Sequence, residues 1–219
     1  MKKKIILVII LLVMIVAGGA IGYYYWYQGN HYISTEDARI AGDQYRVMPR
    51  ISGKLVSLDL EDGQDVVADQ IVGQQDTTNV ANNMLDNASL RSPITGTVLK
   101  VASKPGEVVS PGQAVAIVVD MNKLYVSANI EETDLGRVHV GQTVEFTIDS
   151  FDGKKFMGKV SNIGTATAST FSLLPSTSTS GSFTKVTQRI PIKISIDDKQ
   201  NNTILPGMSA NIKIHLKGN

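Results

Sequence analysis

Side chains able to carry chemistry are few in this sequence and lie far apart. The 219-residue chain has no cysteine and three scattered histidines, His31, His139 and His215. Thiolate zinc sites and thiol nucleophiles are thereby excluded, and isolated imidazoles do not favour a metal centre, so we expect no metal and no cofactor. Adjacent carboxylates occur at four places, all in predicted turns or helix starts, where solvated caps are the ordinary interpretation. We therefore predict no catalytic residues and no enzyme.

The charge balance excludes another class of function. Lysine and arginine total 21 against 20 aspartates and glutamates, which gives a formal net charge of +1. A nucleic-acid-binding surface needs a basic stripe that offsets phosphates, and this composition supplies none. Nucleic acid is therefore not an expected partner.

The most apolar segment lies at the start of the chain. Residues 5–27 form an uncharged run of 23 residues, and a helix of that length spans about 34 Å, enough for the hydrocarbon core of a membrane. Lysines at positions 2–4 precede the run, and a cluster of tyrosines with one tryptophan ends it. The positive-inside rule and the interfacial preference of aromatic rings then predict a single-pass anchor in the cell membrane, with a cytoplasmic N-terminus and the bulk of the chain on the other side.

Two details of this segment allow alternatives. The small residues at 17–20 resemble a cleavage site, so a removed signal peptide is the rival of an uncleaved anchor. We favour the anchor because cleavage would leave a very aromatic stretch exposed at the new N-terminus. Gly18 and Gly22 form a small-xxx-small pair that would let another helix approach, which makes them candidate partner contacts. Glycines that merely happen to lie in a membrane helix are the plainer interpretation.

An internal repeat organises the middle of the chain. Residues 51–76 match residues 94–119 at a constant offset of 43. The identical pairs are Ile51 with Ile94, Gly53 with Gly96, Gly63 with Gly106, Val66 with Val109, Gln70 with Gln113 and Val72 with Val115. Each half predicts a strand, a turn, a short strand, a second turn and a strand. Two such halves can bury a shared apolar layer that neither could bury alone.

This repeat resembles the split lipoyl domain of the HlyD family of membrane fusion proteins, also called periplasmic adaptors. True lipoyl and biotinyl carriers have a modified lysine between the halves, but the connector here, residues 77–90, contains none. In the family the connector is usually a helical hairpin, often long, that reaches toward an outer-membrane duct. With 14 residues this connector is too short for that reach, so contact with such a duct is not expected.

The flanking segments extend the resemblance. Residues 32–42 and 47–53 resemble the family's strand that leaves the membrane anchor and runs into the lipoyl half, in its EmrA-like form. Residues 205–209, Leu-Pro-Gly-Met-Ser, resemble the usual start of the family's final strand. The separate motifs occur in the order that the family has.

The last hundred residues predict a small β-barrel. Apolar and polar residues alternate along the segments 124–130, 144–148, 156–163, 190–196 and 208–216. Alternation on every strand gives each one buried face, as in a small closed barrel. A short helix is predicted at residues 131–138, where acidic residues in the first turn suit the positive end of the helix dipole.

A Ser/Thr-rich segment interrupts the predicted barrel. In residues 165–184, 12 of 20 side chains are serine or threonine, which alone would indicate a solvated linker. Phe171, Leu173 and Leu174 lie in its middle. Apolar side chains in a polar loop favour a contact, either with a partner or by folding back onto the chain. We predict these three as candidate partner contacts with a neighbouring subunit or along the substrate path.

These observations predict a mainly β protein with one N-terminal transmembrane helix, a lipoyl-like (barrel-sandwich hybrid) domain and a small β-barrel domain. The cytoplasmic lysines and the anchor are expected at residues 1–28, followed by a linker and a leading strand at 29–46. The lipoyl-like domain is expected at 47–120, with its connector at 77–90, and the barrel at 121–219.

The resemblance implies a function in export. It implies a non-enzymatic, membrane-anchored adaptor that forms a homo-oligomer and partners an integral membrane transporter. The EmrA-like form implies a drug pump of the major-facilitator type, and the alternative is an adaptor for an ABC-type exporter of peptides or proteins. Two interpretations from other classes are a lipoyl or biotinyl carrier, against which the missing lysine argues, and a surface-binding β-protein that works without a transporter.

Overall fold

Strands dominate the structure and form two separate units. The computed structural model describes residues 2–78, 82–166, 187–199 and 202–216, without the side chains of residues 2–10 and 82–84. The elements in chain order are α1 (Lys2–His31), β1 (Tyr32–Ala41), β2 (Gln44–Val47), β3 (Gly53–Leu58), β4 (Asp65–Val66), β5 (Ile71–Gln75), η1 (Asn82–Ala88), β6 (Ser89–Arg91), β7 (Gly96–Val101), β8 (Val108–Val109), β9 (Ala116–Val119), η2 (Met121–Lys123), β10 (Tyr125–Glu131), η3 (Glu132–Arg137), β11 (Thr143–Ile148), β12 (Lys155–Ile163), β13 (Arg189–Ile196) and β14 (Ser209–His215). One unit is Ala41–Tyr125, the hybrid unit, and the other combines Met1–Ile40 with Val126–Asn219.

The N-terminal helix α1 carries apolar side chains on every side rather than along one stripe. The large side chains described from Leu11 to Tyr27 are exposed in this chain; Leu11 is 52% exposed and Trp26 is 62% exposed. In the described part of the chain, no helix combines the length and the apolar character that a membrane crossing requires.

The hybrid unit consists of two four-stranded sheets that exchange one short strand each. Their strand orders are β2-β9-β7-β4 and β6-β5-β3-β8. Strand β4 belongs to the first half of the repeat but pairs with β7 of the second half, and β8 pairs with β3 in the mirrored way. Neither half of the repeat can therefore complete a sheet alone, which confirms the predicted barrel-sandwich hybrid.

The two halves of the repeat make equivalent hydrogen bonds at their first turns. The Gly63 amide donates to the Val98 carbonyl at 2.8 Å, and the Gly106 amide donates to the Leu55 carbonyl at 2.7 Å. Both glycines have positive φ, 87° and 96°, a conformation that is costly for residues with a Cβ. The turn chemistry predicted from the repeat is confirmed at these positions.

The two halves share one apolar core. Its buried members are Val47, Leu55, Leu60, Val66, Val72, Leu90, Val98, Val109, Val115, Ala116 and Val118. Gln75 is a polar neighbour of this core and is only 1% exposed. Its Nε2 donates to the carbonyls of Ile51 at 3.0 Å and Gly53 at 3.3 Å. Val118 stands at the matching position of the second half, so the two halves differ in polarity at this point.

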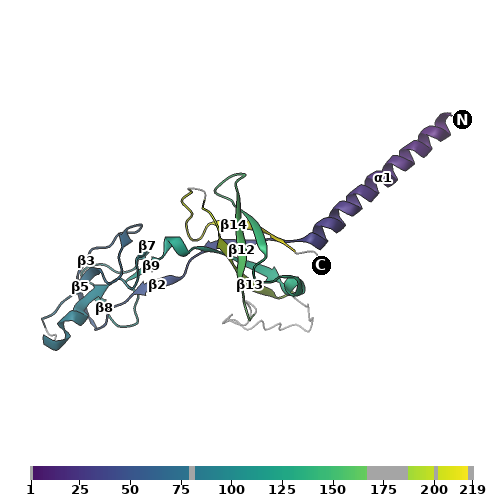
Figure 1. The fold of residues 1–219 in the computed structure, drawn as a ribbon. Helices are drawn as coiled ribbons and strands as arrows, with labels where there is room; N and C mark the ends of the chain where they lie inside the picture. The colour runs from purple at the N-terminus through teal and green to yellow at the C-terminus, as the bar shows by residue number, and fades with distance from the viewer. Residues whose placement is uncertain (1, 79–81, 167–186, 200–201, 217–219) are drawn as a thin grey trace, which may run out of the picture. The chain divides into compact units, whose positions relative to one another are not determined.

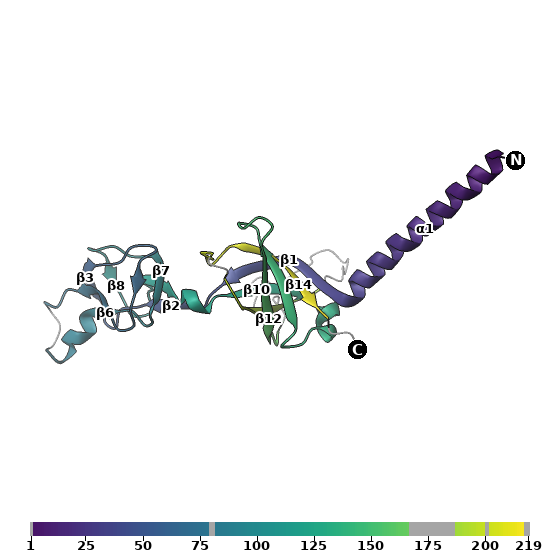
Figure 2. The ribbon, with the colours of Figure 1, turned by 45° about the horizontal axis from the view of Figure 1, so that its top comes forward.

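The second unit contains a closed six-stranded barrel with the order β1-β10-β13-β12-β11-β14 (Figures 1 and 2). The predicted alternation is confirmed, because Val126, Ala128 and Ile130 along β10 are each buried. Phe146 and Phe156 face each other across β11 and β12, with ring centroids 5.5 Å apart. All five predicted strand segments form strands, and the predicted short helix is the 3₁₀-helix η3.

The sixth barrel strand comes from the segment that the sequence assigned to a linker and a leading strand, residues 29–46. Strand β1 pairs with β14 from Tyr32↔His215 to Arg39↔Ser209. A register shift between Thr35 and Ala38 interrupts this pairing. The shift breaks the alternation of buried side chains along β1, so the period-two signal that revealed the other strands is missing here.

Gly96 and Gly53 occupy matching positions of the repeat, but their surroundings differ. A Cβ on Gly96 would lie 2.3 Å from the backbone oxygen of Val119, whereas a Cβ on Gly53 would lie 3.3 Å from the Gln75 Nε2 atom. We expect Gly96→Ala to lower the free energy of unfolding by about 1–3 kcal/mol, because overpacking forces the backbone of β7 and β9 to shift. Gly53→Ala is the matched control. It should lower the free energy of unfolding by less, because the flexible Gln75 side chain can move.

Urea unfolding of the full chain, followed by circular dichroism, measures both variants. The two losses of stability should differ clearly and in this direction. Equal losses would contradict the unequal packing of the two halves.

Candidate partner-binding sites

The predicted helix contacts lie on an open surface of α1. No atom lies within 4 Å of a Cβ built on Gly18, Gly19 or Gly22, apart from the helix itself. The structure therefore brings Gly18 and Gly22 to no other described residue. Their role as contacts for another helix stays a prediction.

The other predicted contacts, Phe171, Leu173 and Leu174, lie outside the described residues. The ends of their segment are defined, because Ile163 on β12 pairs with Ile192 on β13. The segment thus connects two neighbouring barrel strands. The proposal for these three side chains still rests on the sequence.

The connector between the repeat halves is short and locally braced. Its described part contains the single 3₁₀-helix η1. At its start, the Asp76 carboxylate accepts hydrogen bonds from the hydroxyl and the amide of Thr78, and these bonds hold the pKa of Asp76 below its usual value. At its end, Asp86 lies 3.0 Å from the Arg91 guanidinium and 4.0 Å from that of Arg50. These exposed pairs orient the connector more than they stabilise the unit.

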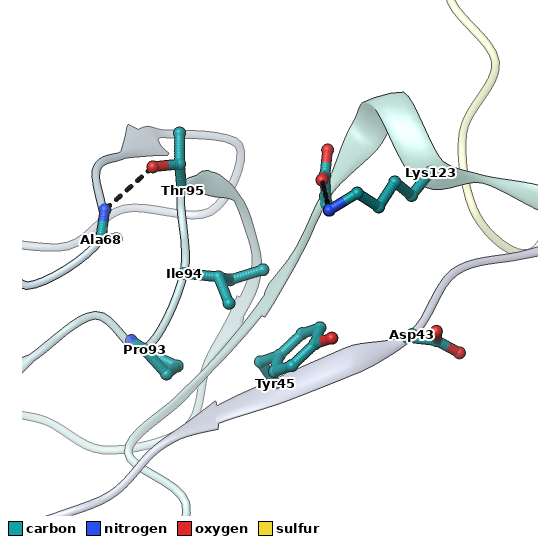
Figure 3. A pocket seen from close by; sticks show the side chains of 8 residues that line it. Asp43, Tyr45, Ala68, Pro93, Ile94, Thr95 and Lys123 are labelled. Atoms are coloured by element: carbon teal, nitrogen blue, oxygen red, sulfur yellow. Dashed lines mark hydrogen bonds and ion pairs between the residues drawn. The ribbon is translucent and has the colours of Figure 1, made fainter.

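The hybrid unit also contains a pocket of about 300 Å³, which the sequence did not reveal. Its lining residues are Asp43, Tyr45, Ala68, Pro93, Ile94, Thr95, Asp120 and Lys123. In Figure 3, Tyr45 and Ile94 form an apolar wall, and Lys123 comes from the segment across from them. Lys123 is paired with Asp120 at 3.1 Å. The pocket is at the small end of the range for ligand sites, and its residues are too far apart in sequence to give a motif.

Two family models match the chain, one for each folded part. The model described as "RND MFP, barrel-sandwich hybrid domain" matches residues 43–121, and the "YknX-like beta-barrel domain" matches residues 124–214. The matches include both halves of the repeat, the barrel strands from β10 to β13 and all but the last residue of β14.

Curated relatives and solved structures agree with these matches. The putative efflux system component YhbJ of Bacillus subtilis is 39% identical over 192 residues, which are 85% of this chain and 81% of YhbJ. The multidrug export protein EmrA of Escherichia coli is 38% identical over 135 residues, 60% of this chain but 35% of EmrA, so the chain spans about a third of that relative. The membrane fusion protein Spr0693 of Streptococcus pneumoniae R6 has a similar fold, with a TM-score of 0.63, 17% identity and coverage of 85% of this chain and 99% of Spr0693.

The open surface around Gly18 and Gly22 gives a direct test with a matched control. We expect Gly18→Leu combined with Gly22→Leu to reduce association with a second helix, because the leucines fill the surface that close helix approach requires. Gly19→Leu should have little effect, because Gly19 is equally open but lies on another side of α1.

Light scattering in mild detergent, together with the amount of any co-purifying membrane protein, measures the association. If the double variant behaved like Gly19→Leu, the glycine pair would be no contact site.

Proposed function

Because the chain belongs to the membrane fusion protein family, whose members are non-enzymatic adaptors of efflux systems, we propose that it is the adaptor subunit of an EmrA-like, multidrug-type export system. In this role the chain positions itself beside a membrane transporter and shapes the exit path of the substrate. The transporter supplies the energy for export.

The observation that carries this proposal is a hybrid fold without a carrier lysine. The exchanged strands and the equivalent turns support a lipoyl-like scaffold. Residues 77–90 between its halves contain no lysine and therefore offer no acceptor for a lipoyl or biotinyl group. A scaffold of this kind without an acceptor fits a docking or spacing element.

We further propose that α1 anchors the chain in the cytoplasmic membrane, with the N-terminus inside and the folded units outside. The uncharged run of residues 5–27 and the lysines at positions 2–4 support this topology. The exposed tyrosines and Trp26 near the end of α1 fit the headgroup region. An apolar environment would also accommodate the large apolar side chains that α1 exposes from Leu11 to Tyr27.

The partner that we propose is a major-facilitator transporter, since the EmrA-type relatives carry the names of multidrug export proteins. An ABC-type exporter of peptides or proteins is the alternative partner. The short connector with its one described 3₁₀-helix supports an adaptor that makes no contact with an outer-membrane duct. Several copies of the chain would surround or flank the transporter.

Purification of the anchored full chain from its own host in mild detergent tests the partner. We expect an integral membrane transporter to co-purify and mass spectrometry to identify it as a major-facilitator protein. An ATPase subunit in the complex would favour the alternative, and the absence of any transporter would favour a surface-binding protein. Mass spectrometry of the purified chain should show no lipoyl or biotinyl adduct on a lysine, because such an adduct would indicate a carrier.

The Ser/Thr-rich segment gives a second test. If Phe171, Leu173 and Leu174 contact a neighbouring copy, changing all three to serine should lower the oligomer mass, because the contact loses its apolar area. Light scattering reports that mass, and circular dichroism should show an unchanged barrel.

The matched control changes Ser176, Ser178 and Ser180 of the same segment to alanine, which should leave the oligomer mass unchanged. An unaltered mass for the triple-serine variant would rule out the apolar contact between copies.

A further inference from the structure

The junction between α1 and the barrel has no loop. Helix α1 ends at His31 and barrel strand β1 begins at Tyr32, a direct passage that Figure 2 shows. One covalent connection leaves soft backbone dihedrals about which a helix can pivot. A fixed orientation at this junction therefore depends on non-covalent contacts with the last turn of the helix.

The barrel and the neighbouring 3₁₀-helix η3 supply such contacts at the C-terminal end of α1. Arg137, the last residue of η3, donates from Nη2 to the Gly29 carbonyl at 2.6 Å and to the Asn30 carbonyl at 3.2 Å. The Leu216 amide donates to the His31 carbonyl at 2.9 Å. The last carbonyls of a helix lack partners within the helix and carry partial negative charge, so a guanidinium is well suited to them.

Arg137 is itself held in place by residues around η3 and the barrel. Its Nη1 lies 3.4 Å from Asp134 Oδ1, and its carbonyl accepts a hydrogen bond from Gln142 Nε2 at 3.0 Å. The next residue, Val138, is only 3% exposed. The Glu132 amide at the start of η3 donates to the Gln188 carbonyl beside β13. These contacts make η3 a fixed support from which the arginine reaches the helix.

From these contacts we propose that Arg137 is a positioning residue that couples the orientation of α1 to that of the barrel. The proposal rests on the proposed function, in which α1 is the membrane anchor. With the hydrogen bonds from Arg137 to the helix carbonyls in place, a tilt or rotation of the anchor moves the barrel with it. Without these hydrogen bonds, the junction between His31 and Tyr32 absorbs that movement, and the barrel presents no constant face to the transporter.

The absence of cysteine from the chain makes the test direct. Tyr25→Cys on α1, where the side chain is 72% exposed, and Lys159→Cys on the exposed face of β12 provide two spin-label sites. Pulsed electron paramagnetic resonance on the full chain in nanodiscs then reports the distribution of distances between helix and barrel. We expect one narrow distribution with Arg137 present and a broad one with Arg137→Ala.

Two further variants make the test specific. Arg137→Lys keeps the charge but loses the planar fork, so its distribution should have an intermediate width. Arg189→Ala removes another barrel arginine, which pairs with Asp37 at 2.6 Å, and should leave the distribution narrow. Thermal melts by circular dichroism check that the barrel remains folded in every variant.

A distribution for Arg137→Ala as narrow as that of the unsubstituted chain would overturn the proposal. Equal broadening with Arg189→Ala would overturn it too, because the effect would then be a general loosening of the barrel. The measurement needs no transporter. A failure to co-purify a pump would therefore count against the proposed function and leave this result standing.

Discussion

Closure of the barrel by β1 is the constraint on which the rest of the architecture depends. Without β1, strands β10 and β14 would each present an unpaired edge, and such edges invite aggregation. Because β1 precedes the hybrid unit and β10 follows it, the hybrid unit is an insertion between two neighbouring strands of the barrel. The same closure brings the end of α1 to the barrel wall, since the helix runs directly into β1.

The hybrid unit builds one core from two similar short segments. Exchange of β4 and β8 makes each sheet depend on both halves. The halves are not identical in detail, because the carbonyl of Ile51 is satisfied by the Gln75 side chain and that of Ile94 by the Ser92 hydroxyl. Equivalent backbone groups must be paired wherever they are buried, but different side chains can do this.

The sequence predicted those parts of the fold that produce a periodic pattern of residues. Alternation revealed the barrel strands from β10 onward, and glycines at a constant offset revealed the hybrid unit. The leading strand was predicted, but its place in the barrel was not, because the register shift in β1 leaves only Ile33, Ala38 and Ile40 buried and so hides the alternation. Arg137 and the pocket around Tyr45 were missed because their partners are distant in sequence, and a lone arginine or tyrosine gives no local signal. The predicted contacts at Gly18, Gly22, Phe171, Leu173 and Leu174 concern surfaces between chains and await the tests above.

The pairing of β1 with β14 also determines which part of the chain can fold first during synthesis. The hybrid unit has all its strands within Ala41–Tyr125, so it can assemble as soon as that stretch has been synthesised. The barrel must wait, because its first strand pairs with its last, and contacts between distant residues form slowly. A chain that stops early, or is clipped near its end, keeps β1 without its partner and exposes a strand edge. The barrel therefore closes only in chains that contain β14, and a chain without this strand carries an edge open to pairing with other chains.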